Sequence, residues 1–379
     1  MKDKKSGYYI YYETNQKLVG VNKKVENQIK MLNRYFDCQG VIISKEKANI
    51  ARSMSWRMPL GSFGRNYEQV FDIVKCKPDF FYIRFVPVDR RFLNFIKSLR
   101  ERFPASKILL EIPTYPYKGE LLASLSMLPF YFKDLYYRDR LKNYVDRIVT
   151  LTEDKYIFGI PTIRIMNGIV VEDIKMIGDQ NVSGGGINLI AVACFQVHHG
   201  YERLIMGMKQ YYEENIENRR QVYLHMVGDG SELEKYKKLV YQHKLEEYVI
   251  FYGQQGGEKL DEIYDRMDVA LGSFGFYKIG LEKSSVLKVR EYLSRGLPIV
   301  SACQEDAFDD GVHEFYLRIE NNDSVVDIEQ IVHFYTRLFS NGVSRLEMAE
   351  NIRRFAREKV DMSVTMKPVI EYILEAGND

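Results

Sequence analysis

The sequence predicts an α/β protein of two doubly wound domains, each with a parallel sheet covered by helices on both faces. Three observations predict it. Strand-like apolar runs alternate with helical patterns along the chain, which is the rhythm of β-α-β units. The chain has 379 residues, enough for two domains. The alternation stops once, at the polar, glycine-rich segment 178–186, and then starts again.

The first half of the chain contains six strand candidates. Amphipathic stretches such as 22–36 and 90–103 lie between them and are expected to be helices. We therefore expect an N-terminal Rossmann-like domain over residues 1–177. The strand candidates are 8–12, 40–44, 80–85, 107–112, 147–151 and 162–166.

The second half repeats the pattern after segment 178–186, which has no periodicity and is interpreted as a linker. We expect a C-terminal Rossmann-like domain over 187–360, followed by a helix over 361–379 that packs on the N-terminal domain. Because ligands of such sheets bind outside the carboxyl ends of the strands, the site is expected in a cleft between the domains. The strand candidates are 187–194, 222–230, 248–253, 268–273 and 297–302.

Composition excludes several classes of protein. The formal net charge is only +2, so the chain has no nucleic-acid footprint. The four cysteines form no Cys-x-x-Cys pair, which is typical of reduced thiols in a cytoplasmic protein. We expect neither a signal peptide nor a membrane span, because the long apolar runs that they need are absent. His198 and His199 lack an accompanying cluster of ligands, so we expect no metal site and no metal cofactor.

The segment "SSVLKVREYLSRGLPIV" (284–300) predicts a helix that begins after Ser284 or Ser285 as N-cap and ends at Gly296. Its apolar stripe, which would pack on a sheet, consists of Val286, Val289 and Leu293.

Lys288 stands in the first turn of this helix, where a cation costs up to about 1 kcal/mol. A bound anion would offset that cost, since free N–H groups, a serine hydroxyl and a lysine together make a phosphate site. Glu291, one turn later, can accept hydrogen bonds from a ribose diol. The alternative is a surface pair of Lys288 with Glu291, worth about 0.2–0.5 kcal/mol. These residues alone leave both interpretations open.

The pattern Ser-x-x-Lys-x-x-Glu-Tyr-Leu-x-x-Gly-x-Pro-Ile in this segment resembles a block in retaining glycosyltransferases of the GT-B fold, in the broad group called family 4. The resemblance covers about residues 8–375 and looks closest to bacterial transferases of surface-polysaccharide synthesis. Other segments resemble the family in the same order: 20–32, 110–120, 145–169, 197–205, 226–240 and 249–273.

The resemblance implies a site for the donor, a nucleotide diphosphate sugar. Glu291 would bind the ribose, and Ser285 and Lys288, with the backbone amides of Ser285, Val286 and Leu287, would hold the diphosphate. The N-terminal domain would bind the acceptor and would also approach the diphosphate with a loop from Gly20 to Lys23 that includes Asn22.

Two glycines complete the nucleotide-binding candidates. Gly253 and its neighbours would line the base pocket. Gly228 lies in a Gly-Asp-Gly, but the third glycine of the dinucleotide fingerprint is missing, so a plain strand-to-helix turn is the better interpretation.

The chain departs from the family pattern in two ways. The first of two glutamates spaced seven residues apart is replaced by Lys283, and two diphosphate-binding cations are replaced by Cys194 and His199. His199 is expected to donate a hydrogen bond to phosphate, although an ordinary histidine pKa of about 6.5 makes it a weak cation at pH 7. Lys278, Lys283 and Arg203 are candidate replacement cations. We assign Lys278, with Lys288 and His199, to the catalytic set.

Two segments of the N-terminal half are acceptor-side candidates. In 112–120, after a strand, Thr114, Tyr115 and Glu120 could touch the sugar or acceptor, or this could be a loop ordered by its prolines. The segment 121–142, rich in Leu, Phe and Tyr with a basic end, is either a peripheral membrane contact or a helix packed within the domain. We favour the packed helix.

We therefore expect a metal-independent retaining enzyme that moves a hexose from a UDP-sugar or GDP-sugar to a lipid-linked glycan acceptor. We expect it in the cytoplasm, peripheral on the inner face of the cytoplasmic membrane. Two alternatives stay open. One is an epimerase or phosphorylase on the same fold. The other is a non-catalytic partner that binds nucleotide sugars, motivated by Lys283 and Cys194.

Overall fold

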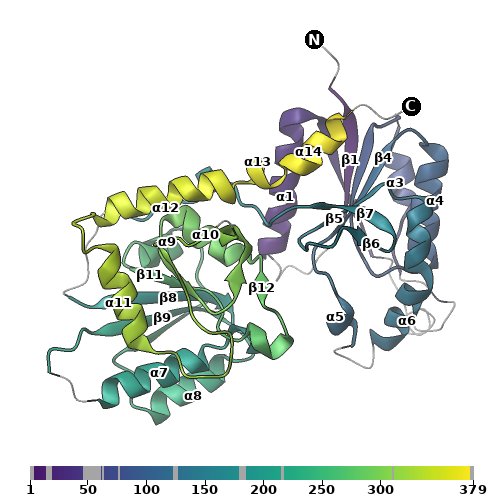
Figure 1. Ribbon diagram of the computed structural model, residues 1–379. Coiled ribbons are helices and arrows are strands. Elements are labelled where there is room, and N and C mark those ends of the chain that lie inside the picture. Colours follow the sequence, from purple (N-terminus) through teal and green to yellow (C-terminus); the bar gives the residue numbers. More distant parts are fainter. Residues whose placement is uncertain are drawn as a thin grey trace. The chain divides into compact units, whose positions relative to one another are not determined.

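The computed structural model describes residues 4–13, 19–45, 61, 64–75, 77–122, 127–178, 185–214, 217–309 and 311–375. The chain divides into two compact units, one formed by Met1–Met166 with Thr365–Asp379 and the other by Asn167–Val364. Each unit is a parallel sheet with helices on both faces (Figure 1). The predicted fold class is confirmed.

The boundaries of the units differ from the predicted ones. Residues 167–178 belong to the second unit, because the Asn167 amide donates to the Ser285 hydroxyl (3.0 Å) and the Gly178 amide donates to the Asp265 carboxylate (3.1 Å). At the other end, Met362 also belongs to the second unit, since its amide donates to Ile169 O (2.8 Å). Of the predicted linker, residues 179–184 lie outside the described residues.

The sheet of the first unit has seven strands within the described residues, in the order β2-β1-β3-β4-β5-β7-β6. Neighbouring strands are parallel except β6 and β7, which are antiparallel. The strands are β1 (Ser6–Tyr12), β2 (Asp37–Ile43), β3 (Phe80–Arg84), β4 (Lys107–Ile112), β5 (Arg147–Thr150), β6 (Tyr156–Ile157) and β7 (Ile160–Arg164).

Helices cover both faces of this sheet, α1 and α14 on one side and α4 and α6 on the other (Figure 1). The C-terminal helix α14 packs on this unit as predicted: Lys5 Nζ donates to Ile373 O (2.6 Å) and Lys107 Nζ to Tyr372 O (2.5 Å). The helices are α1 (Val19–Tyr35), α3 (Glu68–Ile73), α4 (Arg90–Arg102), α5 (Lys118–Leu122), α6 (Leu128–Tyr137), the 3-10 helix η2 (Arg138–Asn143) and α14 (Lys367–Leu374).

The sheet of the second unit is parallel, with six described strands in the order β10-β9-β8-β11-β13-β15. The chain starts in the middle, at β8, so the strand order reverses between β8 and β11. A separate pair joins β12 to β14. The strands are β8 (Ile187–Cys194), β9 (Val222–Asp229), β10 (Val249–Gly253), β11 (Val269–Leu271), β12 (Lys283–Ser284), β13 (Ile299–Ser301), β14 (Gln304–Glu305) and β15 (Tyr316–Arg318).

In Figure 1, α7 and α8 lie on one side of this sheet, and α10 and α12 on the other. The α-helices of the unit are α7 (Glu202–Glu213), α8 (Leu233–Gln242), α9 (Glu258–Tyr264), α10 (Leu287–Arg295), α11 (Ile328–Leu338), α12 (Arg345–Lys359) and α13 (Met362–Thr365), the last ending at the unit boundary. The 3-10 helices are η3 (Val171–Asp173), η4 (Val197–His199), η5 (Phe276–Ile279) and η6 (Asp306–Phe308).

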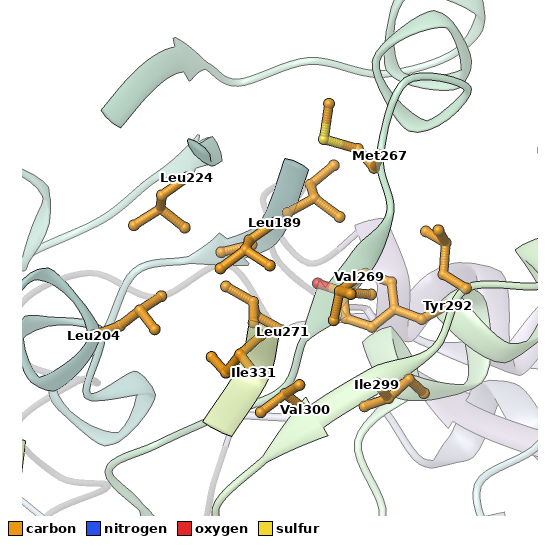
Figure 2. Close-up of a cluster of buried hydrophobic side chains, with 14 of the residues drawn as sticks. Leu189, Leu204, Leu224, Met267, Val269, Leu271, Tyr292, Ile299, Val300 and Ile331 are labelled. Carbon is orange, nitrogen blue, oxygen red and sulfur yellow. The ribbon is translucent and has the colours of Figure 1, made fainter. Parts of the chain in front are cut away.

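Helix α10 is fixed on the sheet by its apolar face. Figure 2 shows Tyr292 of α10 beside Val269 of β11, among buried side chains of neighbouring strands. The Tyr292 hydroxyl accepts a hydrogen bond from the Val192 amide of β8 (3.0 Å). Burial of Val289 and Leu293 confirms two members of the predicted stripe. Among the described residues, none of the helices has the length and hydropathy that crossing a bilayer requires.

Candidate functional site

Polar groups converge where the strand order of the second sheet reverses. Beyond β8 the chain forms η4 and reaches Tyr201, and beyond β11 it reaches Gly272. Lys288, near the N-terminus of α10, joins these two segments: its Nζ donates to the Tyr201 hydroxyl (3.1 Å) and to Gly272 O (3.0 Å). This is the edge at which open α/β sheets bind ligands.

The Lys288 amine has no carboxylate partner among the described residues. Both of its acceptors are neutral, and none of the carboxylates in the described parts of the chain lies within ion-pair distance. Partial burial lowers the pKa of Lys288 to about 7, although the carboxylate of Glu305 acts to raise it. One of its three N–H donors therefore remains for a ligand. The alternative of a Lys288–Glu291 surface pair is wrong, because Glu291 binds Arg295 instead (3.1 and 3.0 Å).

Helix α10 starts later than predicted, at Leu287, after Val286 in an extended conformation. Neither serine is its cap. Ser284 lies in β12, and the Ser285 hydroxyl oxygen accepts from the amide of Asn167 (3.0 Å) and from Arg290 Nη2 (3.0 Å). Lys288 is thus the second helical residue. The first turn keeps its free amides, and its N-cap residue Val286 makes no side-chain capping hydrogen bond.

His199 lies at the end of η4 and is buried. Its Nδ1 accepts from the Gln196 amide (2.9 Å), so the neutral ring carries its proton on Nε2. Burial, with help from Lys288 and His198, lowers the pKa of His199 to about 2. His199 is therefore an uncharged hydrogen-bond donor at neutral pH. This sharpens the prediction of a weak cation.

The loop that carries His199 is held close to the segment after β11. The Phe274 amide donates to His199 O (2.8 Å). Gly200 adopts a φ of +64°, and a Cβ on it would lie 2.5 Å from the Gly275 nitrogen. Only glycine fits this close approach, which sets His199 and Tyr201 beside each other with nearly parallel rings (5.9 Å between centroids, 4° between planes).

Carboxylates neutralise two of the other predicted cations, and the third is used to hold backbone oxygens. Lys278 binds the Glu202 carboxylate and also donates to Val197 O (3.3 Å), so it stays near η4 with its charge offset. Lys283 pairs with Asp309 (2.6 Å). Arg203 is buried and donates to backbone oxygens, among them Ser324 O (2.6 Å) and Glu320 O (3.1 Å). Its role is to hold loops together.

The two glycine candidates are glycines for different structural reasons. A Cβ on Gly228 would lie 1.9 Å from Ala193 O, so packing of β9 on β8 already requires a glycine there. Gly253 ends β10 with a φ of +65°, and a Cβ on it would meet no neighbouring atom. The positive φ favours glycine at position 253, where there is room for a side chain. At position 228 the predicted strand-to-helix turn explains the glycine.

The candidates of the first unit are scattered along its elements. Gly20 and Asn22 lie in α1, which begins at Val19, so the predicted loop is the first turn of a helix. After β4, Thr114 is exposed and Tyr115 half-buried. Glu120 lies in α5, and its side chain is outside the described residues.

Helix α6, after α5, packs within the domain by one of its faces, as the favoured interpretation predicts. Lys133 and Asp134 of α6 are buried in the domain, while Phe132 and Tyr136 of the same helix are each 63% exposed. Helix α6 thus packs by one face and presents aromatic rings on the other.

The sequence analysis missed Arg290, which is fully buried beneath the start of α10. Arg290 follows Val286 by four residues and therefore lies on the face of the apolar stripe, a signal that could have found it. A second buried cluster, in the first unit, was missed as well. There Glu111 accepts from Lys24 Nζ (2.9 Å) and the Tyr82 hydroxyl (3.0 Å). Burial raises the pKa of Glu111, but Lys24 and Arg84 outweigh it and hold it at about 2.

Comparison with known proteins agrees with this geometry. Residues 175–355 match the family described as Glycosyl transferases group 1. A comparison with curated protein sequences finds no match.

Several solved structures share the fold. The apo form of the lipopolysaccharide outer core galactosyltransferase WaaB has a TM-score of 0.58 and 14% identity, covering 97% of this chain and 99% of its own. A glycosyltransferase from Rickettsia africae has a TM-score of 0.62 and 14% identity, covering 99% of this chain and 100% of its own. HepE from Anabaena, in complex with UDP, has a TM-score of 0.61 and 12% identity, covering 97% and 99%.

The family match spans the second unit, which carries Lys288, His199 and Glu291, and the structural matches span nearly the whole chain. Residues 175–355 thus match the group 1 glycosyltransferases, and the chain as a whole has the fold of the GT-B glycosyltransferases.

Proposed function

We propose that the chain is a retaining hexosyltransferase. It takes the sugar from a UDP-sugar or GDP-sugar and transfers it to a lipid-linked glycan in the synthesis of a bacterial surface polysaccharide. The observation that carries the donor half of this proposal is Lys288. Its ammonium has only neutral acceptors, at the N-terminus of α10 and at the switch point of the sheet.

A diphosphate would offset the unfavourable charge of Lys288. The helix terminus favours an anion through its dipole and its free amides, which include those of Leu287, Lys288 and Val289. The amides of Ser285 and Val286, just before the helix, are proposed to add to them. The Ser285 hydroxyl and His199 Nε2 add two neutral donors. The donor phosphates would thus be held by one cation and several N–H and O–H groups.

The ribose would bind Glu291, the predicted partner of its diol. Arg295 binds through Glu291 Oε1 only, so the second oxygen is left to accept hydrogen bonds, and the side chain is 29% exposed. HepE, which shares the fold, is described in complex with UDP and glucose, which supports a nucleotide sugar as the donor.

The proposed reaction is a front-face displacement. The acceptor oxygen forms a bond to the anomeric carbon while the bond from that carbon to the β-phosphate oxygen breaks, both on the same side of the sugar. The departing phosphate oxygen takes the proton of the acceptor hydroxyl. Negative charge grows on this oxygen, and Lys288, the Ser285 hydroxyl, His199 Nε2–H and the helix amides would stabilise it. We propose that these groups serve in place of a metal ion.

The acceptor half of the proposal has weaker support. WaaB, which shares the fold, is described as a lipopolysaccharide galactosyltransferase, and a lipid-linked acceptor would suit the exposed aromatic face of α6. Peripheral membrane contact through Phe132 and Tyr136 is proposed on that basis.

Calorimetric titration with UDP and GDP tests the donor half of the proposal, and release of the nucleotide from UDP- and GDP-sugars tests turnover. We expect one nucleotide to bind and Lys288→Met to weaken its binding strongly. Binding of neither nucleotide, or equal affinity in wild type and Lys288→Met, would contradict the proposed site. Tight binding of a nucleotide sugar without turnover, with and without glycan acceptors, would favour the non-catalytic partner.

A further inference from the structure

Arg290 is the largest fully buried side chain of the described residues, and it lies directly behind the proposed diphosphate site. Its guanidinium donates to three points of the surrounding backbone and loop: Nε to Asn167 O (3.0 Å), Nη1 to Val286 O (3.4 Å) and Nη2 to the Ser285 hydroxyl (3.0 Å). Two of these contacts fall on the residues that precede α10.

Two buried carboxylates offset the charge of Arg290. Asp306 accepts from Nη2, and Glu305 lies 3.6 Å from Nη1. An arginine stays charged at any relevant pH, and its rigid fork presents its donors in fixed directions. Because these acceptors occupy the fork and no part of it reaches solvent, Arg290 cannot touch a ligand itself. Any effect on the donor must pass through the groups that Arg290 holds.

The Ser285 hydroxyl is held by two donors. A hydroxyl oxygen can accept two hydrogen bonds and donate one. The Ser285 oxygen already accepts two, from the Asn167 amide (3.0 Å) and from Arg290 (3.0 Å). Throughout the described part of the chain, no acceptor takes the hydroxyl hydrogen. The hydroxyl is therefore restricted to donating, which favours an acceptor oxygen such as that of a phosphate.

The backbone of the same loop is held from the other side. Asn167 Nδ2 donates to Ser285 O (2.5 Å), while Arg290 binds Val286 O in the next residue. The loop is thus fixed at two successive carbonyls, immediately before the free amides of α10. A preorganised set of donors binds an anion better than one that must be ordered on binding.

We infer that Arg290 is a positioning residue for the donor diphosphate: it fixes the Ser285–Val286 loop and leaves the Ser285 hydroxyl only its hydrogen to offer. This inference rests on the proposed function. Asp306 and Glu305 serve it by holding the guanidinium in place, and the three side chains together form a support beneath the anion-binding turn.

Arg290→Lys tests the inference, because lysine keeps the positive charge but lacks the planar guanidinium and its fixed donors. The matched control is Arg353→Lys in the same unit. Arg353 is also a buried arginine, and it donates to backbone oxygens at the other end of α10 and in η3: Ser294 O (2.5 Å), Ile174 O (2.8 Å) and Val171 O (2.9 Å). Both variants are measured for urea unfolding and for UDP or GDP affinity, whichever nucleotide the wild type binds.

We expect both variants to lose stability, but only Arg290→Lys to lose nucleotide affinity, roughly tenfold. A double-mutant cycle then separates positioning from general damage. Ser285→Ala should cost roughly tenfold in the wild type and less than threefold in the Arg290→Lys background. If Arg290→Lys does not fold, Asp306→Asn replaces it in the cycle, with the same direction and a smaller loss.

Three results would overturn the inference. Unchanged affinity in Arg290→Lys is one. Equal losses of affinity in the Arg290→Lys and Arg353→Lys variants is the second. An equal effect of Ser285→Ala in both backgrounds is the third. Failure of the proposed function is distinguishable from these results, since it would show as full nucleotide affinity in Lys288→Met.

Discussion

The two ends of helix α10 each carry a basic residue, and they are built in opposite ways. At the C-terminal end, Arg295 binds Glu291 (3.0 Å) and Asp261 (2.7 Å), with its guanidinium 3.9 Å from the centre of the Tyr264 ring. At the N-terminal end, Lys288 binds a hydroxyl and a carbonyl oxygen and no carboxylate.

The comparison separates a structural cation from one available to a ligand. Arg295 stands where the helix dipole favours a cation, and two carboxylates offset its charge. Lys288 stands where the dipole disfavours a cation, and no partner in the described regions compensates it. The positive charge of Lys288 is therefore unfavourable in the free protein and becomes favourable when an anion binds. A diphosphate site requires a cation of this kind.

The largest expected effect is the loss of nucleotide affinity on Lys288→Met. Hydrogen bonds to charged groups contribute about 1.5–3 kcal/mol, so affinity for the nucleotide should fall roughly 10–150-fold. Calorimetry of wild type and variant measures it, with Lys209→Met on the surface of α7 as the control. Similar losses of nucleotide affinity in both variants would mean that Lys288 has no particular role in binding the nucleotide.

The second prediction concerns stability and pH. The pKa of Lys288 is about 7 in the folded chain and about 10.4 when unfolded. Between these values the unfolded chain binds more protons, so the contribution of Lys288 to stability rises with pH, by up to about 1.4 kcal/mol per pH unit. Urea unfolding from pH 7 to 9 should show the free energy of unfolding of wild type rising relative to that of Lys288→Met. A constant difference would mean that the pKa of Lys288 is not lowered.

Most of the fold could be predicted because its signals are local. The runs 187–194 and 107–112 match β8 and β4 residue for residue, since a strand buried on both faces is apolar along most of its length. Strands β12 and β14, of two residues each, were not predicted. Strands this short carry no periodicity and depend on long-range pairing.

The site was predictable in part. The position of Lys288 against the helix dipole could be seen from sequence, and so could a role for His199. The start of α10 could not, because Ser285 is taken by Asn167, which lies 118 residues earlier in the chain. The compensation of Lys278 by Glu202 and of Lys283 by Asp309 is likewise a tertiary contact that spacing does not reveal.

The third prediction addresses the C-terminal end of α10. Arg295→Met should lower the free energy of unfolding by about 1–3 kcal/mol, because Glu291 and Asp261 lose a shared partner. Nucleotide affinity should fall less than in Lys288→Met, since Arg295 acts only by orienting Glu291. A larger loss of affinity than of stability would contradict the division between the two ends.

The smallest expected effect concerns Glu291 and the ribose. Wild type should prefer UDP or GDP over its 2′,3′-dideoxy analogue by about 1–2 kcal/mol, and Glu291→Ala should reduce that preference to nearly nothing. The ratio of two affinities in one variant is insensitive to partial unfolding. A preserved ratio would assign the ribose to another residue.

The most direct test of the account measures protons taken up when the nucleotide binds. At pH 8 the free Lys288 is mostly neutral, and a bound diphosphate should restore its charge. Calorimetry in buffers of different ionisation enthalpy should therefore show uptake of about one proton per nucleotide by wild type and almost none by Lys288→Met. Equal uptake by both proteins would contradict the claim that Lys288 is the cation of the donor site, whereas no uptake by either protein would mean that Lys288 is already charged before the nucleotide binds.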